Sequence, residues 1–283
     1  MRALTKPTGS GPGAVPRPPV VRELLLVAGL FVVYKIGRRL ALGRTDAAFR
    51  NADRMWDLER VLHLPGEGAV QSLLLRDDTM VHLANVYYAT VHFPATVLFL
   101  VWLYLRRPLH YVWARRVLAL VTAAALVLPF TFPLAPPRML ASTALVDTGR
   151  LYGPSVYGPP NTDHLSNQFA AMPSLHFGWA LMVAIGLIAA TRSRWRALWL
   201  VHPLITLTVI VGTANHYWLD AVAAAVMLGA ALTVVPVPGR GGARAAGPAR
   251  SRETAAAGGR SRTGRGPVAA PAAGGRTFEA AAP

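Results

Sequence analysis

The stretch Asn215-His216-Tyr217-Trp218-Leu219-Asp220 places a histidine and an aspartate four residues apart in a run that is otherwise as apolar as a membrane helix. On an α-helix this spacing puts both side chains on one face, one turn apart. A carboxylate beside an imidazole fixes its tautomer and raises its basicity, which makes a nucleophile or general base of the histidine. Because an ionisable pair in or beside an apolar segment is costly to keep there, we predict a functional role for His216 and Asp220.

The composition is that of a membrane protein. Of the 283 residues, 53% are hydrophobic and only 15% are charged, and several apolar runs are long enough to cross a bilayer. The net charge is +16, but the basic residues flank the apolar runs. This distribution is typical of membrane topology and argues against nucleic acid as a partner. The chain has no cysteine, which excludes disulfides and thiolate-held metals.

Six apolar runs predict an all-α, polytopic membrane protein, a six-transmembrane-helix bundle in residues 20–235. Their approximate bounds are 20–36, 80–105, 117–134, 169–190, 197–214 and 216–235.

The remaining segments are predicted to lie outside these spans. An amphipathic helix over 46–64, within the region 37–78, is expected to lie in the membrane interface or to pack on the bundle. Residues 139–168 are polar and rich in Gly and Pro, and we interpret them as an outer loop. The Pro- and Gly-rich residues 1–19 and the basic tail 236–283 cannot build a core, so both are predicted to be disordered.

The arginines predict the orientation of the bundle. The connections 106–116 and 191–196 carry seven arginines, which places them, and with them both termini, in the cytoplasm. The region 37–78 then lies outside, with seven arginines offset by seven acidic residues. In this topology Arg138, His176 and His216, each at a span end, meet at the outer face of the cell membrane.

Three motifs follow one another along the chain: Ala135-Pro136-Pro137-Arg138, Met172-Pro173-Ser174-Leu175-His176, and the stretch 215–220 quoted above. Together they resemble the type 2 phosphatidic acid phosphatase superfamily, most closely its inositol phosphorylceramide synthase-like (inositolphosphotransferase) branch. The resemblance covers residues 45–235. It implies a membrane enzyme that acts on a lipid phosphate or phospholipid substrate and needs neither a metal nor another cofactor.

The resemblance also implies residue roles. His216 matches the nucleophile that becomes phosphorylated, and Asp220 matches the carboxylate that orients it. His176 matches the histidine that protonates the leaving oxygen and then deprotonates the incoming hydroxyl. Arg138 and Ser174 match the groups that bind the phosphate. Two histidines and an arginine fork suit phosphoryl transfer, which depends mainly on positioning and on charge stabilisation.

The chain departs from the phosphatase pattern at two phosphate-binding cations. Thr131 stands where that pattern has a lysine, and Ile210 stands where it has an arginine. Arg150 and His164, in the outer loop, are candidate replacements by location. The reduced cation set favours a phosphodiester, which carries one negative charge less than a phosphomonoester.

Three functions stay open. We favour a lipid phosphotransferase of the inositol-phosphate-transferring type, followed by a lipid phosphate or polyprenyl pyrophosphate phosphatase. A non-catalytic transporter or scaffold is the third. The alternative interpretations of the site residues are a structural His216–Asp220 pair, a helix-capping His176 and an interfacial Arg138. The isolated histidines of the spans are interpreted as hydrogen-bonding residues of the bundle: His82, His92 and His202.

Overall fold

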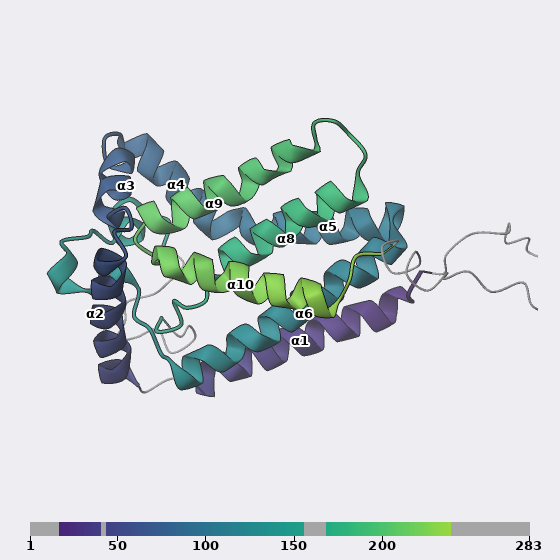
Figure 1. Cartoon of the computed structure of the whole chain (residues 1–283), viewed down its shortest axis with the longest axis horizontal. Helices are drawn as coiled ribbons and strands as arrows, with labels where there is room; N and C mark the ends of the chain where they lie inside the picture. The colour runs from purple at the N-terminus through teal and green to yellow at the C-terminus, as the bar shows by residue number, and fades with distance from the viewer. Residues whose placement is uncertain (1–16, 41–43, 156–167, 239–283) are drawn as a thin grey trace, which may run out of the picture. The chain divides into compact units, whose positions relative to one another are not determined.

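The computed structural model describes residues 17–40, 44–155 and 168–238. This part of the chain is all-helical, as predicted, and its one β-bridge joins Leu134 to Ala170. The helices, labelled in Figure 1, are α1 (Val20–Leu40), α2 (Thr45–Val61), α3 (Glu67–Leu74), α4 (Asp78–Thr90), α5 (His92–Arg106), α6 (Pro108–Thr131), α7 (Thr148–Tyr152), α8 (Leu175–Ala190), α9 (Val201–Gly212) and α10 (Trp218–Val234). Three 3-10 turns accompany them: η1 (Pro137–Met139), η2 (Ala141–Thr143) and η3 (Arg196–Leu200).

The long apolar helices pack side by side, and α2 lies across one end of them (Figure 1). Their shared core is built from α5, α6, α8 and α10, where apolar residues recur at helical spacing. It contains Leu103 of α5, Val117 of α6, Met182 of α8 and Leu228 of α10, all at most 1% exposed. Helix α9 packs on α8 and α3.

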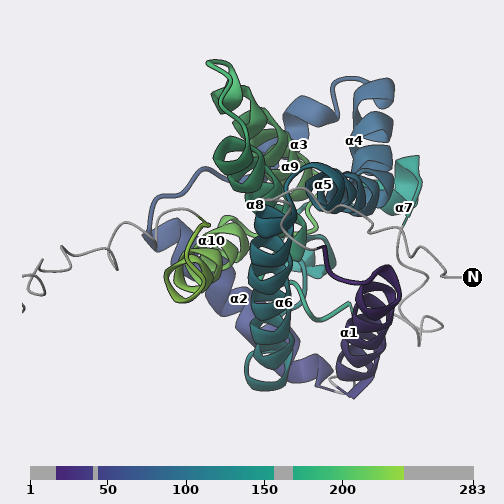
Figure 2. The ribbon, with the colours of Figure 1, turned by 90° about the vertical axis from the view of Figure 1, so that its right-hand side faces the viewer.

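Helix α1 contacts α6, and both ribbon views show the two side by side (Figures 1 and 2). Glu23 joins them, because it accepts hydrogen bonds from Arg115 and, at 2.7 Å, from the Tyr111 hydroxyl. Glu23 is 6% exposed, so these partners satisfy a carboxylate that would otherwise be costly to bury.

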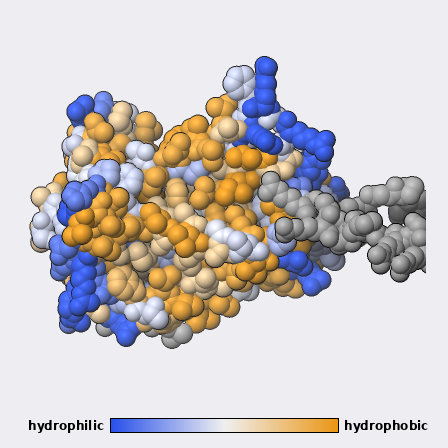
Figure 3. All heavy atoms as spheres, in the orientation of Figure 1, coloured by the Kyte–Doolittle hydropathy of each residue, from blue (hydrophilic) through white to orange (hydrophobic). Residues whose placement is uncertain are grey.

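The surface of the helical part is divided by polarity. In Figure 3, hydrophobic side chains occupy the middle of the visible face and hydrophilic ones gather towards its two ends. Exposed apolar residues include Val97 and Leu98 of α5, Leu204 of α9 and Val226 of α10. A broad exposed apolar band between polar ends is typical of a protein that sits in a bilayer.

Only some of the predicted membrane spans correspond to helices that are long and apolar enough to cross a bilayer. Within the described residues, α6 alone is long and apolar enough to cross a membrane, or two spans result if α4 and α5, bent by 48°, count as one. Helices α8, α9 and α10 are apolar but shorter. The six-span bundle is therefore not confirmed and stays a proposal.

One predicted boundary is wrong. The connection expected over 106–116 is reduced to Arg107, because α6 begins at Pro108, where the fixed φ of proline and its missing N–H suit the first helical position. Arg115 and Arg116 therefore lie inside a helix. The amphipathic helix expected over 46–64 is present as α2, and it packs on the bundle through Ala48, Ala52, Met55 and Glu59.

A close helix contact predicts a stability difference. A Cβ at Gly186 of α8 would overlap the ring of Phe99 in α5, whereas a Cβ at Gly229 of α10 would meet nothing within 4 Å. Gly186→Ala is expected to destabilise the protein by about 1–3 kcal/mol, the usual cost of overpacking. Gly229→Ala should melt at or above the wild-type temperature. Thermal unfolding in detergent checks both, and equal melting of the two variants would contradict the packing.

Candidate functional site

His216 lies in the tight turn between α9 and α10. Ala214 adopts a positive φ of 54°, and the backbone N–H groups of Asn215 and His216 both donate to the Ile210 carbonyl at 3.1 Å. This reversal closes the C-terminal end of α9. Helix α10 then begins only at Trp218, so His216 precedes the helix, and the expectation that His216 and Asp220 share one helix face is wrong.

The predicted contact between His216 and Asp220 nevertheless forms. Asp220, in the first turn of α10, accepts a hydrogen bond from the backbone N–H of Tyr217 at 3.0 Å through Oδ2. The same oxygen lies 3.2 Å from Nδ1 of His216. Asp220 is fully buried and His216 is 5% exposed. Capping of the helix start, and not helical spacing, therefore turns the carboxylate towards the imidazole.

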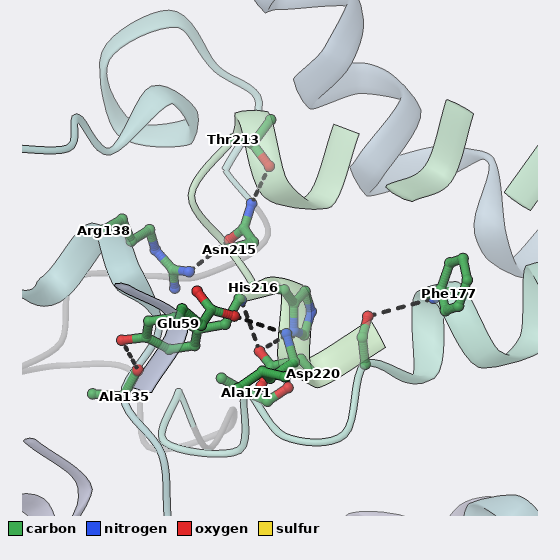
Figure 4. A network of polar contacts seen from close by, with 12 residues as sticks. Glu59, Ala135, Arg138, Ala171, Phe177, Thr213, Asn215, His216 and Asp220 are labelled. Carbon is green, nitrogen blue, oxygen red and sulfur yellow. Dashed lines mark hydrogen bonds and ion pairs between the residues drawn. The ribbon is translucent and has the colours of Figure 1, made fainter. Parts of the chain in front are cut away.

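A second acceptor fixes the tautomer of His216. Its Nδ1 lies 2.8 Å from the carbonyl oxygen of Ala171 (Figure 4). A carbonyl oxygen only accepts, so Nδ1 carries the proton, which it shares between Ala171 and Asp220. The neutral ring then has its free electron pair on Nε2, the nitrogen that a nucleophilic histidine needs.

Ala171 is held in place by the backbone before α8. The Leu134 N–H donates to the Phe169 carbonyl at 2.9 Å, and the Ala171 N–H donates to the Leu134 carbonyl at 3.2 Å. The neighbouring Tyr217 hydroxyl donates to the Ala135 carbonyl at 3.2 Å. These hydrogen bonds join the backbone at the start of the first motif to the backbone just before the second motif, and they link both to the third motif through Tyr217.

His176 lies beside His216, with ring centroids 6.2 Å apart. It stacks on Tyr88 at 4.4 Å and packs against His92 at 4.5 Å. A small cavity behind these rings is also lined by Thr206 and Ile210. His82 and His202 do hydrogen-bond within the bundle, to the Tyr152 carbonyl and to the Tyr87 hydroxyl, as interpreted from the sequence. His92 differs, because it supports the ring of His176.

Ser174 joins the second motif to α10. Its backbone N–H donates to the Asp220 carbonyl at 3.1 Å. Its hydroxyl oxygen accepts from the Phe177 N–H at 3.4 Å and caps α8, and the residue is fully buried. The backbone donor is therefore engaged within the protein, and a phosphate-binding role for Ser174 stays a prediction.

Arg138 is brought to the same turn. Its backbone N–H donates to the Ala214 carbonyl at 3.0 Å, and Nη1 donates to Asn215 Oδ1 at 2.6 Å (Figure 4). Its Nε lies 3.5 Å from Oδ2 of Asp147. The side chain is only 4% exposed, while that of Asp147 is 37% exposed. The guanidinium is thus fixed beside the residue that precedes His216, and its charge is partly compensated.

Neither of the two positions where the phosphatase pattern has a cation carries a basic side chain in this protein. Thr131 is exposed and its hydroxyl donates to the Leu128 carbonyl, whereas Ile210 is fully buried beside the His176 cavity. Arg150 is exposed on α7. His164 lies outside the described residues. Within those residues, no group of three or more His, Asp or Glu side chains is arranged to hold a metal ion.

Several site groups escaped prediction because they are distant in sequence or belong to the backbone. The acceptor at Ala171 is a backbone carbonyl, which residue type does not reveal. Its position just before the Pro173-Ser174 motif is the one sequence feature that points to it. Asp147 is one acid among several. His92 stood out only as an isolated histidine in an apolar run.

The arrangement suits two-step group transfer. A buried histidine presents a free Nε2, a second histidine ring lies next to it, and an arginine is anchored to the same turn. Phosphoryl transfer of this kind requires a nucleophile, an acid–base group and an anion-binding cation, and these three residue types can supply them.

Comparison with known proteins agrees with this chemistry. The sequence model of the PAP2 superfamily matches residues 53–234, well over half of the chain. That range includes Arg138, Ser174, His176, His216 and Asp220. No curated protein and no solved structure matches the chain significantly.

Proposed function

Because the chain belongs to the PAP2 superfamily, we propose that it is an integral membrane phosphotransferase of the inositol-phosphate-transferring type. Membership of the superfamily supports an enzyme that acts on phosphate esters. The apolar helices support a membrane protein. The observation that carries the proposal is the hydrogen bonding of His216 Nδ1, which leaves Nε2 as the nucleophile.

In the first step, Nε2 of His216 attacks the phosphorus of a phospholipid and forms a P–N bond. The P–O bond to the lipid alcohol breaks, and His176 gives its proton to the departing oxygen. Asp220 stabilises the positive charge that develops on the His216 ring, and Arg138 stabilises the phosphate oxygens.

In the second step, the hydroxyl of an acceptor attacks the phosphohistidine. His176 takes the hydroxyl proton, a new P–O bond forms, and the P–N bond breaks to restore neutral His216. An alcohol as acceptor makes the protein a transferase, and water makes it a phosphatase.

The charge of the site favours a phosphodiester. Asp147 compensates part of the charge on Arg138, and Thr131 and Ile210 stand where a phosphatase of this superfamily has cations. A phosphodiester monoanion needs less positive charge than a phosphomonoester dianion. A lipid phosphate or polyprenyl pyrophosphate phosphatase is the alternative function.

The membrane arrangement belongs to the same proposal. Six spans, with both termini in the cytoplasm, put the turn of His216 at the outer face of the cell membrane. The basic connection 191–196 supports this orientation.

The first test follows the fate of labelled phosphatidylinositol. Purified protein in vesicles that hold ³²P-phosphatidylinositol and a diacylglycerol of different chain length should produce labelled phosphatidylinositol with the new chains. His216→Ala should abolish this product, because no nucleophile remains. His82→Ala, which changes an exposed histidine of α4, should not.

Release of free phosphate from ³²P-phosphatidic acid, without any chain exchange, would instead select the phosphatase alternative. Equal exchange by His216→Ala and wild type would rule out His216 as the nucleophile.

A second test concerns Asp147. Asp147→Asn restores the full charge of Arg138, while asparagine can still cap α7 as the aspartate does through the Arg150 N–H. We expect the ratio of kcat/KM for phosphatidic acid to that for phosphatidylinositol to rise about two- to fivefold, the modest effect of a partly exposed pair. Asp57→Asn, on the exposed side of α2, is the matched control. An unchanged ratio would show that Asp147 does not set the charge preference.

A further inference from the structure

Two buried glutamates lie near Asp220. Glu59 of α2 and Glu67 of α3 are both fully buried. Glu59 Oε1 accepts a hydrogen bond from the backbone N–H of Leu219, the residue before Asp220, at 2.8 Å. Figure 4 shows the Glu59 carboxyl next to the start of α10. Glu59 thus ties α2 to the first turn of the helix that carries Asp220.

One cation, Arg60, lies within 4 Å of both carboxyl groups. Among the described residues, Glu59 Oε2 and Glu67 Oε1 have no hydrogen-bond partner. A proton on one carboxyl group would give these buried oxygens a donor and would leave one negative charge for the one cation. Burying both as anions would also be far more costly than burying one.

Arg60 decides which group keeps the charge. Its Nη2 lies 2.8 Å from Glu67 Oε2 but 3.7 Å from Glu59 Oε2. Glu67 is therefore the carboxylate and Glu59 the acid, protonated on Oε2. Burial, together with the neighbouring Glu67 carboxyl group, raises the pKa of Glu59 to about 9.

We infer that Glu59 and Glu67 share one proton and act as positioning residues that hold the first turn of α10, and with it Asp220, against His216. With Glu59 neutral, Arg60 and Glu67 compensate each other, so the pair of glutamates adds no net negative charge beside Asp220. Loss of the proton would add an anion that faces Glu67, Asp220 and the phenol of Tyr217, with Arg60 as the nearest cation.

The consequence for stability has a definite sign. The unfolded chain releases the Glu59 proton near its ordinary pKa of 4.5, whereas the folded protein keeps it up to about 9. The stabilisation is complete below the lower value and is lost as the pH rises through the higher one. The melting temperature of the wild type should therefore fall between about pH 5 and pH 9.

Three variants test the inference. In Glu59→Gln, the amide oxygen can accept from Leu219 and the amide N–H can donate to Glu67, so the shared proton is replaced by a permanent donor. Glu59→Leu removes both contacts. Asp57→Asn, on the exposed side of the same helix, is the control.

The infrared spectrum of the protein near neutral pH should contain a carboxylic-acid C=O band that Glu59→Gln loses and Asp57→Asn keeps. Glu59→Gln should also flatten the fall in melting temperature with pH. A spectrum without this difference, or parallel melting profiles, would overturn the shared proton.

The positioning role is tested with the chain-exchange assay, so this test rests on the proposed function. Glu59→Leu should lower kcat about 10- to 100-fold with little change in KM, because Asp220 loses its alignment. Glu59→Gln should restore most of the rate. Full kcat in Glu59→Leu would overturn the role. A wild-type protein that does not exchange chains, but has the infrared band and the pH-dependent melting, would contradict the proposed function and not the pair.

Discussion

The hydrogen bonds at Nδ1 of His216 are the constraint on which the site depends. One proton on a buried nitrogen is shared between the Ala171 carbonyl at 2.8 Å and the Asp220 carboxylate at 3.2 Å. In a buried setting an unpaired polar group is costly, and a backbone carbonyl can only accept, so the nitrogen that faces it carries the proton. Together the two acceptors assign the free electron pair to Nε2, and the proposed chemistry of the site rests on that assignment.

The rest of the structure keeps the turn around His216 in place. Three parts of the chain, distant in sequence, fix it through backbone groups: Arg138 to the Ala214 carbonyl, Ser174 to the Asp220 carbonyl, and Glu59 to the Leu219 N–H. These contacts add to those of the turn's own side chains, in which Asp220 accepts from the Tyr217 N–H and Asn215 accepts from Arg138. The apolar helices hold the ends of the turn, and α2 and α3, which lie outside the predicted spans, add further contacts to it.

The sequence predicted which residues meet better than it predicted how they meet. Spacing and apolar surroundings singled out His216 and Asp220, and the structure does bring them together with His176 and Arg138. The helical spacing used to pair them was wrong, because positive φ at Ala214 and capping at Tyr217 are not visible in residue types. Asp147 and Glu59 were missed because their partners are far away in sequence. Hydrophobic runs predicted the all-helical class, whereas the number of spans depends on helix bends and lengths that hydropathy does not resolve.

The tautomer of His216 is the most direct test of this account, and it needs no substrate. Nitrogen NMR of histidine-labelled protein, at a pH where the ring is neutral, distinguishes a proton on Nδ1 from one on Nε2, and His216→Gln identifies the signal among the eight histidines. We expect a proton on Nδ1, held by Ala171 and Asp220. A proton on Nε2 would contradict it, because the nucleophilic nitrogen would then be blocked.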